Sequence, residues 1–296
     1  MSNTLANKIG NFLPKFIFNF FQPKYHLLRE IFKLYKTGGK LGYEKEVGSW
    51  FASYPFSGSQ MKISIRSYRE LRRLIQFGEK QKDTVFNWLQ NLKNVKCFYD
   101  IGSANGLEGF LFYHLYDSKV CFIEPGTPNI ESIMKTTFLL GKSGSNINNI
   151  EIIHAGCDFE SHYDKLYMLC PPKAGETHIS FSEPSSYERR GRIYNNIVSQ
   201  WIYGISIDDM WLKLNLEVPS HIKIDVDGFE NRVMKGATKT LTDKLVDSWA
   251  IEITGEANMS YIQKLMKDND YEEISRSEIY PGEKAKTFDI IFEKIK

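Results

Sequence analysis

The sequence predicts an α/β fold built around a mostly parallel sheet. Two observations carry this prediction. From residue 97 onward, apolar strand segments alternate with helical segments, and the first of these strands runs directly into a glycine-containing turn. With 296 residues, of which 42% are apolar, the chain can bury a large core. We divide it into an N-terminal extension (1–95) and a main α/β domain (96–296).

The extension is basic, whereas the whole chain is nearly neutral. Residues 1–95 hold about 16 Lys and Arg against about 6 Asp and Glu, although the net charge of the chain is only +2. This asymmetry favours an anionic partner for the extension. A net charge of +2 does not favour binding of nucleic acid through bulk charge, so we expect no nucleic-acid partner.

The extension is expected to be mainly helical. A helix over 27–35 ends at a Gly-Gly pair, an aromatic and turn-rich stretch covers 48–58, and a short helix covers 85–92. Between them, Ser67 and Glu70 form a capping box that opens a further helix. Arginines crowd the start of that helix, and we expect them on a solvated face, with an anion-binding patch as the alternative; they are Arg66, Arg69, Arg72 and Arg73.

The most apolar run near the start, residues 12–21, is too short to span a bilayer. It is interpreted either as a helix packed on the main domain or as an interfacial anchor that makes a peripheral membrane contact. The run lacks a small-residue cleavage site, and the four cysteines form no C-x-x-C pair. These features predict a cytoplasmic protein without a zinc site, and the anchor alternative would place it at the inner face of a membrane.

The turn after the first strand, Asp100-Ile-Gly-Ser-Ala-Asn-Gly106, is the first candidate binding element. Gly102 and Gly106 can adopt backbone angles that a Cβ atom disfavours, and they allow a ligand to approach the main chain. Asp100 lies at the end of the strand, where an α/β sheet presents its ligand crevice. By itself such a turn is a weak signal.

The second candidate element is the strand 119–124, which ends in Glu124, 22 positions after Gly102. A carboxylate at this spacing from a glycine turn is placed to accept hydrogen bonds from both ribose hydroxyls of a nucleoside. Together, the two elements predict a nucleoside-containing ligand.

The rest of the main domain continues the alternation. A helix is expected over 129–140 and a third strand over 150–155, followed by a long insertion, 159–205, on the substrate side. Ser206 caps a helix. In the fourth strand, 221–227, alternation places Lys223, Asp225 and Asp227 on one side. The helix 230–241, the fifth strand 248–254, the helix 261–266 and a closing hairpin of 271–274 with 287–293 complete the pattern.

At Ile222-Lys-Ile-Asp-Val-Asp-Gly-Phe-Glu-Asn-Arg-Val-Met-Lys-Gly-Ala237 the sequence resembles the FkbM family of S-adenosylmethionine-dependent methyltransferases, whose hallmark reads approximately K-I-D-V-E-G-A-E-x-x-V-L-x-G-A. The turn 100–106, Ile123-Glu-Pro125, Ser206-Ile-Asp-Asp209 and Ala250-Ile-Glu-Ile253 resemble further motifs of that family in matching order. Asp227 stands where glutamate is usual, and Phe229 replaces a small residue.

This resemblance implies a class I, Rossmann-like methyltransferase fold, a seven-stranded sheet with one antiparallel edge strand. It also implies O-methylation of a hydroxyl on a saccharide or related small molecule, within glycan biosynthesis. The basic extension and the aromatic run suggest an anionic or lipid-linked acceptor. The donor would be held by the turn and by two further strand ends; the cofactor-binding candidates are Asp100, Gly102, Ser103, Asn105, Gly106, Glu124, Cys157 and Asp158.

Asp225 is the first candidate for the general base, with Lys223 beside it to orient it. Asp227 and Glu252 complete the catalytic set. The carboxylates of Asp225, Asp227 and Glu252 could instead hold Mg²⁺, which would activate a sugar diol as a Lewis acid.

Two other classes of function compete with a methyltransferase. An NAD-dependent oxidoreductase would share the glycine turn and Glu124, but Gly102 and Gly106 do not give the G-x-G-x-x-G spacing. A catalytically degenerate domain that acts as a binding or recruitment module is compatible with the aspartate at position 227.

Overall fold

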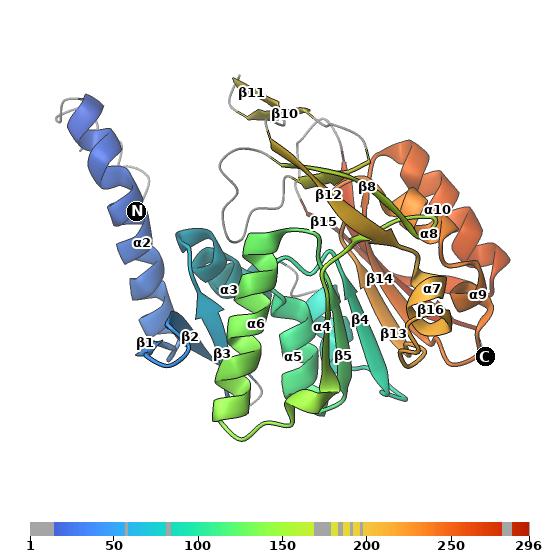
Figure 1. Ribbon diagram of the computed structural model, residues 1–296, viewed down its shortest axis with the longest axis horizontal. Helices are drawn as coiled ribbons and strands as arrows, with labels where there is room; N and C mark the ends of the chain where they lie inside the picture. Colours follow the sequence, from blue (N-terminus) through green and yellow to red (C-terminus); the bar gives the residue numbers. More distant parts are fainter. Residues whose placement is uncertain are drawn as a thin grey trace.

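The computed structural model describes the backbone of residues 15–56, 59–80, 84–168, 179–182, 186–189, 192–195, 198–279 and 286–295. A seven-stranded sheet forms its centre, in the order β15-β16-β14-β13-β4-β5-β6 (Figure 1). These strands are β4 (Cys97–Ile101), β5 (Lys119–Ile123), β6 (Ile150–Ile153), β13 (His221–Ile224), β14 (Ser248–Thr254), β15 (Tyr271–Glu278) and β16 (Thr287–Lys294). Only β16 runs against the other strands of this sheet.

This strand order confirms the predicted class I methyltransferase fold, a Rossmann-like and mostly parallel sheet. One detail differs from the expectation. The antiparallel strand β16 is not at the edge but lies between β14 and β15, because it pairs with both of them. The predicted closing hairpin of β15 and β16 therefore forms the edge of the sheet with its first strand outermost.

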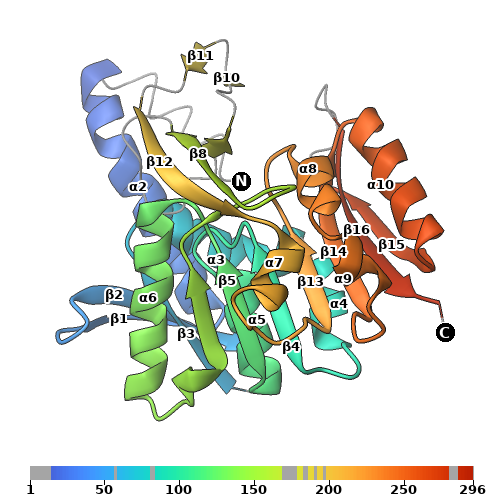
Figure 2. The same ribbon diagram turned by 45° about the vertical axis from the view of Figure 1, so that its right-hand side comes forward.

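Helices cover both faces of the sheet (Figures 1 and 2). Their bounds are α5 (Leu107–Tyr116), α6 (Thr127–Lys142), α7 (Ile207–Leu212), α8 (Glu230–Lys235), α9 (Thr238–Thr242) and α10 (Glu256–Asp268). Because successive side chains of a strand point to opposite faces, Phe98 joins one core with α5, whereas Tyr99 joins the other with α8, α9 and α10. The predicted cap of α7 is confirmed, since Ser206 Oγ accepts a hydrogen bond from Asp209 N at 3.2 Å.

The N-terminal extension combines three helices with a small sheet, and the sheet was not predicted. It contains α2 (Lys15–Lys36), β1 (Lys40–Glu44), β2 (Ser49–Phe56), β3 (Ser59–Ile65), α3 (Tyr68–Lys80) and α4 (Val85–Gln90). The three strands form an antiparallel sheet, β1-β2-β3, where helices and turns were expected. The capping box of α3 is confirmed, because Ser67 N donates to Glu70 Oε2 at 3.0 Å and Glu70 N donates to Ser67 Oγ at 3.2 Å.

The extension and the main domain share one hydrophobic core. Leu34, Ile63 and Leu74 of the extension belong to the same buried cluster as Phe98 and Phe110 of the main domain. Ser64 N also donates to Thr136 Oγ1 of α6 at 2.9 Å. The division at residue 95 is therefore not a boundary in the packing.

The long insertion after β6 forms a second sheet, in the order β7-β12-β8-β9, and a separate hairpin, β10–β11. Its strands are β7 (Gly156–Cys157), β8 (His162–Met168), β9 (Ile179–Phe181), β10 (Ser186–Arg189), β11 (Arg192–Asn195) and β12 (Val198–Ile205). The 3-10 turn η1 (Ile147–Asn149) lies before β6. In Figures 1 and 2, β8 and β12 cross near the ends of β4 and β5.

Residues 12–14 of the apolar run lie outside the described residues, and residues 15–21 form part of α2. Among the described residues, no helix combines the length and the apolar character needed to cross a membrane.

Candidate active site

The glycine turn presses directly against the end of β13. Gly102 has φ +71°, and a Cβ atom at this position would lie 1.8 Å from the carbonyl oxygen of Asp225. Gly102 N donates to Ile123 O at 2.9 Å, and Asp225 N donates to Ile101 O at 3.0 Å. These hydrogen bonds join the ends of the adjacent strands β4, β5 and β13. Only glycine fits at position 102, where β4 and β13 meet.

Three of the predicted cofactor residues, Ser103, Asn105 and Gly106, support the turn from its buried side. Ser103 is fully buried and donates from Oγ to Asp100 O at 2.6 Å. Gly106, with φ +77°, is the N-cap of α5. The Asn105 side chain is fully buried, and its amide has no hydrogen-bond partner among the described residues. These residues define the shape of the turn, while Ala104, which the sequence analysis did not select, faces the hollow described below.

Asp100 lies beneath the turn and does not line that hollow. Alternation in β4 directs its side chain towards α5, where Oδ2 accepts a hydrogen bond from Gly109 N at 3.0 Å. Oδ1 is 3.8 Å from Lys223 Nζ, and burial raises the pKa of Asp100 to about 7. Asp100 therefore supports the turn from below, and its contact with a cofactor, directly or through a water, stays a prediction.

Glu124 sits at the end of β5, in the wall of the hollow, with 4% of its surface exposed. Its Oε2 accepts a hydrogen bond from Ala104 N at 2.8 Å, and Oε1 accepts from Gly126 N at 2.7 Å and Asn129 Nδ2 at 3.0 Å. These bonds fix the carboxylate and tie it to the glycine turn. Burial raises the pKa of Glu124 to about 7 despite these donors.

The end of β13 carries a chain of opposite charges. Lys223, only 3% exposed, donates from Nζ to Asp225 Oδ2 at 3.3 Å. Burial opposes the charge of Lys223, but Asp225, Glu108 and Asp100 outweigh it and raise the pKa of this ammonium. Nη2 of Arg73 lies 4.0 Å from the same oxygen. Oδ2 of Asp225 is therefore close to both a lysine of the sheet and an arginine of the extension.

Three carboxylates meet near this point. Oxygen atoms of Asp225, Asp227 and Glu252 lie within 4.8 Å of one another. Alternation along a strand does not explain the position of Asp227, because β13 ends at Ile224 and Asp227 has φ +51°. The loop after the strand brings it to the cluster. Asp289 of β16 is paired in register with Glu252, and burial together with Asp225 and Asp289 raises the pKa of Glu252 above its ordinary value.

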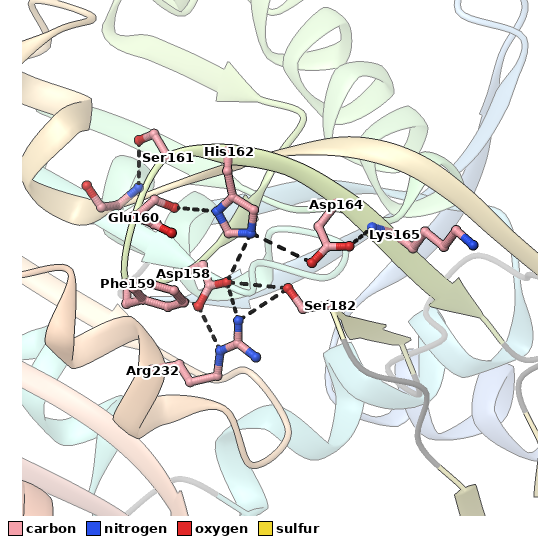
Figure 3. Close-up of polar contacts among 10 residues, drawn as sticks. Asp158, Phe159, Glu160, Ser161, His162, Asp164, Lys165, Ser182 and Arg232 are labelled. Atoms are coloured by element: carbon pink, nitrogen blue, oxygen red, sulfur yellow. Dashed lines mark hydrogen bonds and ion pairs between the residues drawn. The ribbon is translucent and has the colours of Figure 1, made fainter.

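Cys157 and Asp158 have different surroundings. Cys157 lines the hollow, whereas Asp158 binds Arg232 of α8, with Nε at 2.9 Å from Oδ1 and Nη2 at 2.6 Å from Oδ2. Figure 3 shows this pair together with Ser182 and His162, whose Nε2 is 3.8 Å from Asp158 Oδ2. Asp158 thus joins the segment after β7 to α8 and is not among the lining residues; that it borders a cofactor stays a prediction.

The hollow lies at the ends of β4, β5 and β13. It is lined by Arg73, Gly102, Ala104, Ile123, Glu124, Pro125, Asn129, Gly156, Cys157, Leu166, Ile179, Phe181, Asp225, Val226, Asp227 and Phe229. Gly102, Glu124 and Asp225, which are far apart in the sequence, therefore surround one space. The insertion contributes an apolar wall through Leu166, Ile179 and Phe181.

Two parts of the wall were not predicted as site residues. Arg73 was assigned to a solvated face of its helix, and the insertion was assigned to the substrate side without named residues. For Arg73, the sequence did contain a signal: the cluster of arginines at the start of α3, for which an anion-binding patch was the alternative interpretation.

Comparison with known proteins adds likenesses of fold. No protein-family model matches the sequence, and a search of curated proteins finds no match. The crystal structure of methyltransferase FkbM from Methylobacillus flagellatus KT is similar with a TM-score of 0.45 and 14% identity, over 75% of this chain and 53% of that one. This chain therefore spans about half of that protein's length.

Two further similar structures are those of M. capricolum TrmK in complex with S-adenosyl-homocysteine and of the METTL16 methyltransferase domain. TrmK has a TM-score of 0.42 and 10% identity, over 72% of this chain and 68% of that one. The METTL16 domain has a TM-score of 0.45 and 8% identity, over 92% of each chain. The fold of this protein is assigned from its own strand order.

Proposed function

We propose that this protein is an S-adenosylmethionine-dependent O-methyltransferase. The observation that carries the proposal is the hollow that Gly102, Glu124 and Asp225 share. Glu124, fixed on three sides, would accept hydrogen bonds from the ribose hydroxyls of the donor. The turn at 102–104 would border its methionine end, and the apolar side chains of the insertion would cover it.

S-adenosylmethionine, when bound, supplies a methyl group on a sulfonium, an electrophile that needs alignment more than activation. Alignment can lower a barrier by roughly 7–11 kcal/mol. In this chain the walls of the hollow provide it. Asp225 is the proposed general base: it would take the proton of the acceptor hydroxyl while that oxygen bonds to the methyl carbon and the bond from this carbon to sulfur breaks, leaving S-adenosylhomocysteine. Lys223, at 3.3 Å, keeps Asp225 in place.

We propose a saccharide or related small molecule as the acceptor, carrying an anionic or lipid-linked group. The support is the resemblance of the residues 222–237 to the FkbM hallmark and the basic extension, about +10 by count of charged side chains. The site would then work in the cytoplasm, where such precursors are assembled.

The extension also presents an apolar face that suits a membrane surface. Leu28, Phe32 and Tyr35 repeat at helical spacing on α2 and are 65%, 61% and 54% exposed. Lys36 Nζ lies 4.7 Å from the centre of the Phe32 ring. Aromatic residues beside lysines on one helix face are typical of a helix lying on an anionic bilayer, so we propose a peripheral membrane contact through α2.

A divalent cation is the second candidate for the three carboxylates, because Mg²⁺ prefers oxygen ligands of this kind. Chelator treatment separates the two roles. If activity is unchanged after chelation, Asp225 acts as a base, and if activity is lost and Mg²⁺ restores it, the cluster holds a metal ion.

Methyl transfer from labelled S-adenosylmethionine tests the proposal. The acceptor panel comprises nucleotide sugars, lipid-linked saccharides, neutral sugars and an RNA transcript. We expect label on a saccharide hydroxyl and none on RNA. Label on RNA alone would contradict the acceptor proposal. Stabilisation by NAD and not by S-adenosylhomocysteine would favour the oxidoreductase, and tight donor binding without any transfer would favour a recruitment module.

A further inference from the structure

Arg73 of α3 is a cation in the wall of the hollow that has no hydrogen-bonding partner among the described residues. Its Nη1 is buried and makes no hydrogen bond to any described residue, and its nearest carboxylate oxygen, Asp225 Oδ2, is 4.0 Å from Nη2. A guanidinium offers five N–H donors in a planar fork. Leaving buried donors unsatisfied costs free energy, so this group is prepared for a ligand.

The guanidinium of Arg73 stays protonated. Burial would lower the pKa of its guanidinium, but the carboxylates of Glu108, Asp225, Asp227 and Glu252 outweigh burial and raise it. Arg73 therefore presents a permanent positive charge to the hollow.

The rest of the described wall offers an anion no second positive charge. Among the described residues that line the hollow, Arg73 is the only cation, whereas Glu124, Asp225 and Asp227 carry carboxyl groups. Two described cations of the main domain have partners of their own: Lys223 is buried against Asp225 and Asp100, and Arg232 forms a bidentate pair with Asp158.

The glycine turn offers few free donors to an anion. The backbone N–H groups of Gly102 and Ser103 both donate to Ile123 O, that of Gly106 donates to Ser103 O, and that of Ala104 donates to Glu124. A carboxylate that enters the hollow therefore finds its strongest partner in Arg73.

We propose that Arg73 binds the carboxylate of the methionine end of S-adenosylmethionine, which makes the N-terminal extension part of the donor site. This inference rests on the proposed function. With the ribose at Glu124 and the methionine end at Gly102, the carboxylate reaches the side of the hollow where Arg73 lies, and its charge-assisted hydrogen bonds to the fork satisfy the buried Nη1.

A matched pair of ligands tests this role. S-adenosylmethionine and its decarboxylated form differ by the carboxylate alone, and calorimetry gives the dissociation constant of each. We expect the wild-type protein to prefer S-adenosylmethionine by at least about tenfold. Arg73→Gln should remove this preference and leave the affinity for the decarboxylated ligand unchanged. Arg73→Lys, which keeps the charge but loses the fork, should retain part of the preference.

Arg72→Gln is the matched control on the same helix, because Arg72 contacts only its helix neighbours Gln76 and Tyr68 among the described residues. It should keep the wild-type preference. The proposal is overturned if Arg73→Gln and Arg73→Lys keep the full preference, if they lose affinity for both ligands equally, or if they raise only the KM of the acceptor. Equal wild-type affinity for the two ligands also overturns it and leaves the proposed function intact, whereas failure to bind either ligand refutes the proposed function itself.

Discussion

At the scale of single residues, the surroundings of the Asp225 carboxylate are set by two cations. Lys223 at 3.3 Å comes from the same strand, and Arg73 at 4.0 Å comes from a helix of the extension. In β13, Ile222 and Ile224 point into the core with α8 and α9, so Lys223 points to the opposite face, beside Asp100. The alternation of the sequence thus predicts the face on which Lys223 lies.

Replacement of Asp225 by Asn tests its role as base. Asparagine has nearly the same shape but cannot take the proton, so turnover should fall by about 10²-fold to about 10⁴-fold. Binding of S-adenosylhomocysteine, measured by calorimetry, should stay close to wild type. Asp268→Asn, on the exposed end of α10, serves as the control. Unchanged turnover in Asp225→Asn would remove this residue from the base role.

Glu124 should make donor binding depend on pH. Burial raises its pKa to about 7, and the ionised form is the better acceptor for two ribose hydroxyls. Affinity for S-adenosylhomocysteine should therefore increase by up to about tenfold as the pH rises from about 6 to about 8. Glu124→Gln should bind more weakly and lose this dependence; a variant with the wild-type pH profile would refute the assignment.

The raised pKa of Glu124 also makes the stability of the fold depend on pH. Donor affinity should rise with pH, whereas the contribution of Glu124 to stability should fall. Because the folded-state pKa lies above the ordinary value of 4.5, folding favours the protonated form of Glu124. The stability that this group contributes is present below the ordinary value and is lost as the pH rises towards about 7. Asp100 and Glu230 have pKa values raised to about 7 by burial and act in the same direction.

At the scale of elements, the crossing of the glycine turn and the end of β13 sets the geometry of the site. In Gly102→Ala, the added methyl group would meet Asp225 O at 1.8 Å and the residue would also have to keep φ +71°. We expect the free energy of unfolding to fall by about 2–5 kcal/mol, measured by denaturant titration, with donor binding lost as β4 and β13 move apart.

Gly48→Ala is the matched control, because Gly48 has φ +64° but nothing within 4 Å of its added Cβ atom. It carries the backbone strain without the clash, so its loss should be limited to about 1 kcal/mol. If the two variants lose the same free energy, the contact between the turn and Asp225 is not important for stability.

The sequence predicts the elements whose signals are local. The strands β4, β5 and β14 consist mainly of apolar residues, and α3 begins at its capping box. The strands of the extension were missed because their signal is weaker: β2 contains Pro55, and Pro within a run argues against a strand. The insertion likewise consists of strands whose pairing partners lie far apart, as β8 with β12.

In the site, as in the fold, the sequence predicts the positions that follow from local signals and the fold class, but not those that depend on packing between elements. Glu124 and Asp225 stand at the ends of strands, and the carboxyl ends of parallel strands meet at one edge of a sheet, so their convergence follows from the fold class. Arg73 could not be placed in the same way, because its position depends on how α3 packs on the main domain. The pairing of Asp158 could not be predicted for the same reason, since its partner Arg232 comes from another element.

At the scale of the whole molecule, the extension is packed as part of the domain. Its buried side chains share a core with the central sheet and α5, and Arg73 brings it into the hollow. This arrangement explains why an extension outside the resemblance to the methyltransferase motifs can still contribute to the site.

The exposed face of α2 predicts binding to anionic vesicles. The full chain should sediment with vesicles of phosphatidylglycerol and phosphatidylcholine, less so with phosphatidylcholine alone, and added salt should weaken the binding. Leu28→Glu combined with Phe32→Glu should reduce the bound fraction by at least about tenfold. Leu212→Glu, at an exposed position on α7, should bind as wild type. Equal binding of the double variant and the wild type would exclude this face.

Titration calorimetry with S-adenosylhomocysteine tests the central claim most directly, that the ends of β4, β5 and β13 enclose a donor site. We predict one binding site per chain, a stabilisation of about 2.7 kcal/mol at a ligand concentration a hundredfold above Kd, and affinity at least about tenfold weaker in Glu124→Ala. The absence of binding at millimolar ligand, or equal affinity of wild type and Glu124→Ala, would contradict the account.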